Sequence, residues 1–179
     1  MKKLSLLLAL VLLGVGATRC TEAPQQPKTL VAYFSATGTT RAAAQQLAEI
    51  IGADVYEIQP EEAYTAEDLD WRDSLSRSSV EMHDKNSRPA MLGKVANLAE
   101  YERIYIGFPI WWDAAPTIVN TFIDTHDFTG KTLVPFATSG GSTIDNSCKE
   151  LRETYPDYHW LDGRLLNEID PAAIEAWTK

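Results

Sequence analysis

A short hydroxyl-rich loop between an apolar run and a helix-like stretch is the first place where chemistry is expected. Residues 34–40 have the sequence FSATGTT, with hydroxyl side chains, one glycine and no lysine. A helix that begins at the end of this loop has unpaired N–H groups and a positive dipole end, which favour an anion. The loop therefore predicts a phosphate site formed by Ser35, Thr37, Gly38, Thr39 and Thr40. A capped helix start without a ligand is the alternative.

Two common nucleotide motifs do not fit this loop. The G-x-x-x-x-G-K-[ST] loop of nucleotide hydrolases needs a lysine, and the G-x-G-x-x-G loop of dinucleotide-binding proteins needs three glycines. Only Gly38 is present here. The pattern favours a phosphate compound that is held by neutral donors.

A second loop with ligand-binding character follows a later apolar run. Residues 107–116 have the sequence GFPIWWDAAP, in which Pro109 stiffens the backbone next to Ile110. Trp111 and Trp112 are consecutive, and consecutive side chains of an extended segment point to opposite sides. We expect one indole to be packed and the other to be partly free to lie along a planar ring. An aromatic patch for a protein partner is the alternative.

A third loop, residues 137–142, has the sequence ATSGGS. Gly140 and Gly141 let the main chain pass close to a ligand, and Thr138 and Ser139 offer donors and acceptors. A plain glycine-rich turn, with Ser142 capping the next helix, is the alternative.

The elements around these loops alternate between strands and helices. Continuous apolar runs predict strands at 29–34, 53–58, 103–108, 131–138 and 158–166, and helical patterns cover 39–52, 115–126, 142–155 and 170–177. This alternation predicts a doubly wound, five-stranded parallel sheet of order 2-1-3-4-5 with helices on both faces. Ligands of such sheets bind beyond the carboxyl ends of the strands, where all three loops lie. Between 59 and 100 the chain makes a long polar excursion, with one helix expected at 90–98.

Together, the S-x-T-G-x-T loop, P-x-W-W and T-S-G-G-S resemble the flavodoxin family over residues 29–167. The resemblance implies a flavodoxin-like fold and non-covalent flavin mononucleotide (FMN). It implies that residues 35 and 37–40 contact the phosphate. Residues 109–112 would contact the flavin ring on one side, and residues 138–141 would contact its other side and polar edge.

The N-terminus has the order of an export signal. Lys2 and Lys3 precede an apolar run at 4–15 and then small residues, so residues 1–19 are predicted to be a signal peptide of lipoprotein type, with Cys20 as the acylated residue. Ordinary cleavage after Ala17 is the alternative. Residues 20–28 would form a tether and 29–179 a single domain. The protein is thus expected to be exported, either anchored by lipid or free in the periplasm.

Charge and cysteine usage exclude several function classes. Removal of residues 1–19 leaves 13 basic and 25 acidic side chains, a balance that repels nucleic acid. No arginine lies six residues after Cys20 or Cys148, as a cysteine phosphatase requires, and the three histidines lack metal-ligand spacing. Cys148 is expected to be a buried, inert thiol.

The leading hypothesis is an FMN-binding redox protein that transfers electrons to a redox partner protein or a small-molecule acceptor. No side chain stands out as a general acid or base. The alternatives are a nicotinamide-dependent quinone- or nitro-type reductase and a surface-tethered binding module that has lost flavin. In the flavodoxin family, one-electron chemistry is favoured when a peptide beside the flavin turns over, most easily at glycine. Asp113 stands where a glycine would be sought, which favours two-electron chemistry.

Overall fold

A computed structural model describes residues 28–179. The predicted signal peptide, its acylated Cys20 and nearly all of the tether lie outside the described residues. Within residues 28–179, no helix has both the length and the apolar character needed to cross a membrane.

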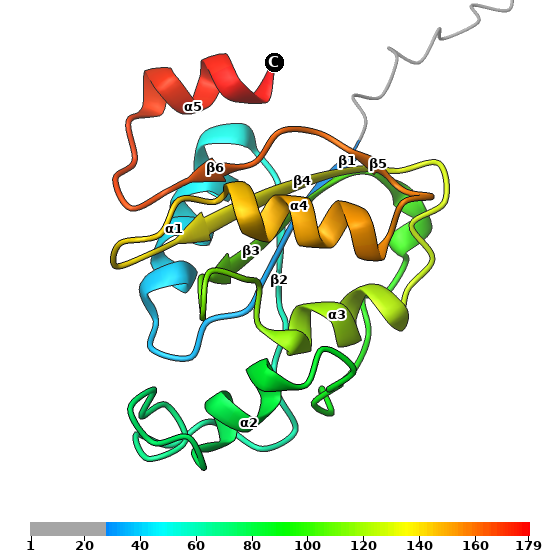
Figure 1. The fold of residues 1–179 in the computed structure, drawn as a ribbon. Helices are drawn as coiled ribbons and strands as arrows, with labels where there is room; N and C mark the ends of the chain where they lie inside the picture. The colour runs from blue at the N-terminus through cyan, green and yellow to red at the C-terminus, as the bar shows by residue number, and fades with distance from the viewer. Residues whose placement is uncertain (1–27) are drawn as a thin grey trace, which may run out of the picture.

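A parallel sheet forms the centre of the fold (Figure 1). Its strands are β1 (Lys28–Tyr33), β2 (Asp54–Glu57), β3 (Tyr101–Pro109), β4 (Thr132–Thr138), β5 (His159–Trp160) and β6 (Arg164–Leu165). Their order is β2-β1-β3-β4-β5, β6 also pairs with β4, and every pairing is parallel. The structure confirms the predicted order 2-1-3-4-5.

The predicted last strand is divided into the two short strands β5 and β6. Gly163 lies in the interruption, where an added Cβ would come within 2.5 Å of the Cys148 sulfur. Cys148 is a free, buried thiol, and burial raises its pKa. The expectation of a buried structural thiol is thus confirmed.

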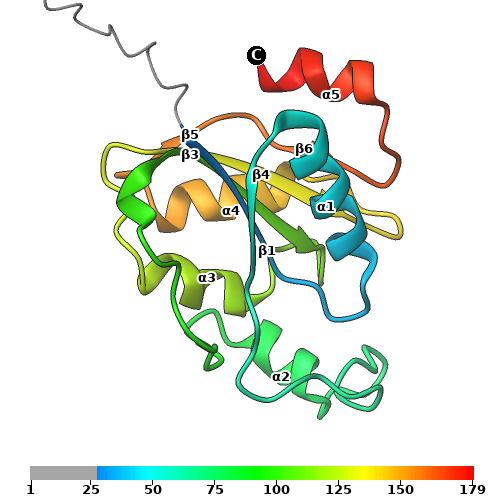
Figure 2. The same cartoon turned by 180° about the vertical axis from the view of Figure 1, so that it is seen from behind.

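Helices cover both faces of the sheet (Figures 1 and 2). One face carries α1 (Thr39–Ile51) and α5 (Pro171–Thr178), and the other carries α3 (Thr117–Asp124) and α4 (Asp145–Thr154). Side chains alternate along β1, so Leu30 and Ala32 pack on the α3–α4 side while Val31 and Tyr33 pack on the α1–α5 side. This alternation produces two separate apolar cores.

The excursion between β2 and β3 differs from the sequence expectation. The helix predicted at 90–98 is wrong: the structure has α2 at Arg77–His83 and a single 3-10 turn, η1, at Leu98–Glu100. Gly93 and Asn97 both have positive φ, which interrupts a helix in the predicted stretch. Residues 90–92 instead run beside 59–61, with a bridge between Pro60 and Met91.

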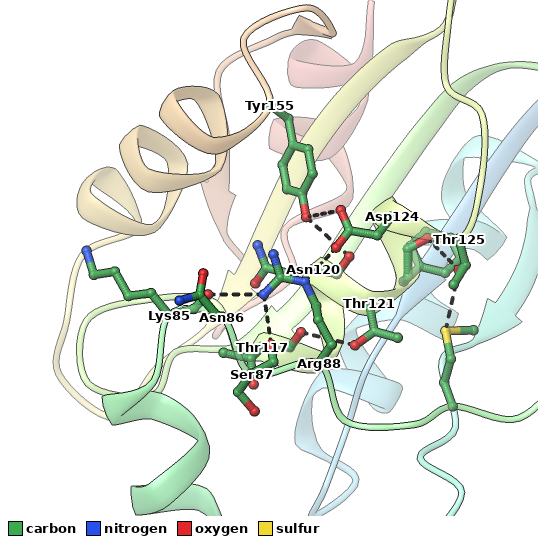
Figure 3. Close-up of polar contacts among 12 residues, drawn as sticks. Lys85, Asn86, Ser87, Arg88, Thr117, Asn120, Thr121, Asp124, Thr125 and Tyr155 are labelled. Carbon is green, nitrogen blue, oxygen red and sulfur yellow. Dashed lines mark hydrogen bonds and ion pairs between the residues drawn. The ribbon is translucent and has the colours of Figure 1, made fainter.

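Residues 85–88 of the excursion are anchored on α3 through Asp124, which also accepts from Tyr155 at the end of α4 (Figure 3). The Nε of Arg88 donates to Asp124 Oδ2 at 2.5 Å, and the Tyr155 hydroxyl donates to the other carboxylate oxygen at 2.8 Å. Arg88 also donates to the carbonyls of Lys85 and Ser87. Burial raises the pKa of Tyr155 to about 12. These contacts fix the excursion against the body of the domain.

Candidate functional site

The predicted phosphate loop, residues 34–40, leads directly into the first turn of α1. Gly38 is the N-cap of α1 with φ 94°, a value that favours glycine, and its N–H donates to Ser35 Oγ at 3.1 Å. No side chain caps the start of α1. The N–H groups of its first turn are therefore available to a ligand, together with the exposed hydroxyl of Thr37.

Thr40 has a different position from the other loop hydroxyls. Its Oγ1 lies 2.8 Å from Thr138 Oγ1, and the two residues are 1% and 5% exposed. One hydroxyl must donate to the other, so the pair retains a single hydrogen that can be given to a ligand. The bond also connects the phosphate loop to the end of β4.

The tryptophan loop, residues 107–116, separates its two indoles, as expected. Trp111 is packed edge-on against Phe34 and Tyr64, with ring centroids 5.6 Å and 5.4 Å away. Trp112 is 41% exposed. One tryptophan is packed and the other is partly free.

A tight turn produces this separation. Trp111 and Ala114 exchange backbone hydrogen bonds of 3.0 Å and 2.9 Å, which leaves Trp112 and Asp113 as the central residues, with φ of 46° and 63°. Two consecutive positive φ values are typical of a type I′ turn, which usually contains asparagine, aspartate or glycine. Asn146 Nδ2 and Ser147 Oγ of α4 both donate to the Asp113 carbonyl, at 3.1 Å and 3.2 Å. The turn is thus held from a second element.

The third loop lies at the same sheet edge but does not line the cleft described below. The Ser139 N–H donates to Asn167 Oδ1 at 2.8 Å, and Asn167 Nδ2 returns a bond to the Ser139 carbonyl at 2.9 Å. The N–H groups of Gly141 and Ser142 donate to Ser139 Oγ. Gly140 and Gly141 are exposed. The hydrogen bonds of this loop are thus made within the loop and with Asn167.

A cleft of about 420 Å³ joins the first two loops at the carboxyl ends of β1 and β3. Among the predicted site residues it is lined by Ser35, Thr37, Thr40, Pro109, Ile110, Trp111 and Trp112. The predicted contacts Gly38, Thr39, Thr138, Ser139, Gly140 and Gly141 are not among its lining residues.

Four lining residues were not predicted from the sequence, namely Ala36 within the predicted phosphate loop and three residues of the excursion. Leu69, Trp71 and Ser78 come from the excursion and form part of the cleft wall. No sequence signal marked Trp71 as a site residue, because a single apolar side chain in a polar stretch is common on protein surfaces.

The cleft is lined by neutral residues only. None of its lining side chains is charged or titrates near neutral pH. Arg41, in the first turn of α1, is paired with Glu57 at 2.5 Å. Within residues 28–179 there is also no group of three or more histidine, cysteine or acidic residues arranged to hold a metal. A ligand here is bound by amides, hydroxyls and aromatic surfaces.

Comparisons with known proteins identify structures of similar fold. The structure resembles a candidate flavoprotein of Bacteroides eggerthii DSM 20697, with 56% identity, a TM-score of 0.84, and 85% of this chain and 96% of that chain covered. A second, from Bacteroides uniformis ATCC 8492, has 58% identity, a TM-score of 0.82, and coverage of 85% and 97%. A flavoprotein of Lactobacillus acidophilus NCFM, solved in complex with FMN, shares the fold at 21% identity, with a TM-score of 0.69 and coverage of 86% and 100%. No curated protein matches the chain. The family profile described as flavodoxin matches residues 28–179, which is the whole of the described structure, and the chain therefore belongs to the flavodoxin family.

Proposed function

We propose that this protein binds FMN without a covalent bond and uses it in redox chemistry. The observation that carries the proposal is the division of one cleft into two ends. One end has hydroxyls and free N–H groups at the start of α1, and the other has the aromatic surfaces of Trp111 and Trp112. A ligand with one phosphate and one planar ring system fits both ends. The Lactobacillus protein, which has the same fold, was solved with FMN.

The donor set favours a mononucleotide. A helix N-terminus with a few hydroxyls can hold one phosphate group without a cationic side chain. No lysine or arginine lines the cleft. Ser35 and Thr37 are placed to donate to the phosphate, and Thr40 can pass on the hydrogen that it shares with Thr138.

Bound flavin supplies the electron and hydride chemistry, and the protein's residues bind and orient it. Trp111, wedged between Phe34 and Tyr64, gives the ring end a rigid wall and excludes water from that side. No lining side chain can act as an acid or base near neutral pH, so a proton must come from solvent or from the partner. These features support transfer of electrons to a redox protein or a small-molecule acceptor.

Titration with two flavins tests the proposal. Purified protein should quench the fluorescence of FMN and bind it more tightly than riboflavin, because riboflavin lacks the phosphate. Thr37→Ala should weaken FMN binding roughly tenfold and leave riboflavin binding unchanged, since one hydrogen bond to a charged group is lost. Thr37→Ser keeps the hydroxyl and is the matched control.

The outcomes separate the competing functions. Protein that quenches neither flavin would contradict the proposal and favour the binding module without flavin. An equal loss for both flavins in Thr37→Ala would mean that the phosphate lies elsewhere. Steady-state turnover with a nicotinamide and a quinone would identify a reductase, and its absence in flavin-loaded protein would favour an electron carrier.

We also propose that the protein is exported and anchored by lipid on Cys20. The support is the order of residues 1–20, with two lysines, an apolar run and a cysteine. Cys20→Ser should move the protein from the membrane fraction to the soluble fraction. Unchanged partitioning would instead favour cleavage after Ala17 and a free protein.

A further inference from the structure

The excursion between β2 and β3 supplies a wall of the candidate flavin cleft. Leu69, Trp71 and Ser78 line the cleft together with Trp111 and Trp112 of the tryptophan loop. Trp71 is 63% exposed, so most of its indole is in contact with water when no ligand is present. An exposed indole that lines a cleft is stabilised by contact with a planar ligand, because the contact removes apolar surface from water.

Hydrogen bonds hold the segment that carries Trp71, residues 65–76, in a defined conformation. Thr65 and Asp68 cap each other, because the Thr65 N–H donates to Asp68 Oδ2 at 2.9 Å and the Asp68 N–H donates to Thr65 Oγ1 at 3.2 Å. Asp70 and Asp73 each accept from the N–H two residues later, at 3.0 Å and 2.8 Å. Side chains therefore close successive turns on both sides of Trp71.

This segment is also tied to α2 and to the packed wall of the cleft. The Ser78 N–H donates to the Asp68 carbonyl at 3.0 Å, and Ser79 Oγ donates to the Asp73 carbonyl at 2.7 Å. Tyr64, just before the segment, packs against Trp111. The position of Trp71 relative to the tryptophan loop is thus set by bonds on both sides of it.

Local contacts restrict the indole of Trp71 itself. The guanidinium carbon of Arg72 lies 4.5 Å from the centroid of the Trp71 ring. A cation on one aromatic face holds the side chain in place and leaves its remaining surface for another contact.

We propose that Trp71 contacts the flavin ring, so that the excursion supplies a cofactor-binding residue in addition to the three loops at the strand ends. This inference rests on the proposed FMN binding. In this arrangement Trp71 contacts the ring end of the ligand and has no role in binding the phosphate. It follows that Trp71 contributes equally to the binding of FMN and riboflavin, whereas Thr37 contributes to FMN alone.

The experiment compares three variants by flavin fluorescence titration. Trp71→Ala should weaken the binding of FMN and of riboflavin by the same factor, roughly tenfold, as expected for loss of stacking on a planar heterocycle. Trp71→Phe should restore most of the affinity. Leu75→Ala is the matched control, because Leu75 is 82% exposed in the same segment and does not line the cleft.

A second measurement does not depend on any variant. Amide hydrogen exchange of residues 65–76 should slow when FMN is added, because the ligand covers this wall. Affinity unchanged in Trp71→Ala, or lost for FMN alone, would overturn the inference, as would exchange unaffected by FMN. Wild-type protein that binds neither flavin would instead overturn the proposed function, and the two failures are thereby distinguished.

Discussion

The buried hydroxyl pair of Thr40 and Thr138 allows a sharp test of the site architecture. The pair joins the first turn of α1 to the end of β4 through a bond of 2.8 Å. Valine has nearly the shape of threonine but neither donates nor accepts a hydrogen bond. Thr40→Val therefore leaves the Thr138 hydroxyl without its partner in a site that is 5% exposed, and Thr138→Val does the same to Thr40.

The expected magnitudes follow from that burial. Leaving one buried hydroxyl unpaired should lower the free energy of unfolding by about 1–3 kcal/mol, and replacing both partners by groups of the same shape should be nearly neutral. The double variant should then be more stable than the sum of the single changes predicts, by an interaction energy of about 2–6 kcal/mol, which is the sum of the two single costs. In a protein of this size, each kcal/mol corresponds to a shift of about 2–4 °C in the midpoint of thermal unfolding.

Urea unfolding of the flavin-free protein measures the stability of the single and double variants. Flavin titration measures their effect on ligand binding separately. Thr37→Val is the comparison, because Thr37 is exposed and its hydroxyl should matter to FMN and not to stability. Single changes at Thr40 and Thr138 that add without interaction would refute the reasoning. So would a Thr37→Val change that lowers stability as much as Thr40→Val.

Three further predictions concern the stability of the fold. Gly107→Ala should destabilise the protein by about 1–3 kcal/mol or more in urea unfolding, because the new Cβ would lie 2.1 Å from a ring carbon of Phe136, and Phe136→Leu should restore part of the loss. Asp113→Gly should raise stability by up to about 1 kcal/mol, because φ at this position is 63°. Burial lowers the pKa of His126 below its ordinary 6.5, and its Nε2 accepts from the Val95 N–H, so the unfolded chain is protonated first as pH falls. The free energy of unfolding should therefore drop below about pH 6.5, and His126→Gln should weaken that drop.

The strands could be located in the sequence because of their burial, and their alternation with helices predicted the order 2-1-3-4-5. Strands buried on both faces are continuous apolar runs, and β1, β3 and β4 have that character. The helix predicted at 39–52 is present as Thr39–Ile51, since Gly52 ends it in the left-handed conformation. Helical periodicity and a C-terminal glycine were therefore sufficient to predict this helix.

The excursion could not be predicted in this way because its structure has another cause. Asp68, Asp70 and Asp73 close its turns by side-chain bonds to nearby N–H groups, and these bonds produce no periodic apolar pattern. The sequence stretch that looked helical is interrupted at Gly93 and Asn97. The placement of Trp71 in the cleft wall depends on the same local bonds, so it became visible only in the structure.

The turn at Trp112 and Asp113 bears on how many electrons move at once. Its backbone is already left-handed at both residues, and the Asp113 carbonyl accepts from Asn146 and Ser147. Turning that carbonyl over would break both bonds and leave the hydroxyl of Ser147, which is 0% exposed, without a partner, at a cost of about 1–3 kcal/mol. The flavodoxin resemblance connects such a turnover with one-electron chemistry. Given the proposed flavin binding, we therefore expect this turn, which α4 holds in one conformation, to favour two-electron transfer through residues that do not line the cleft.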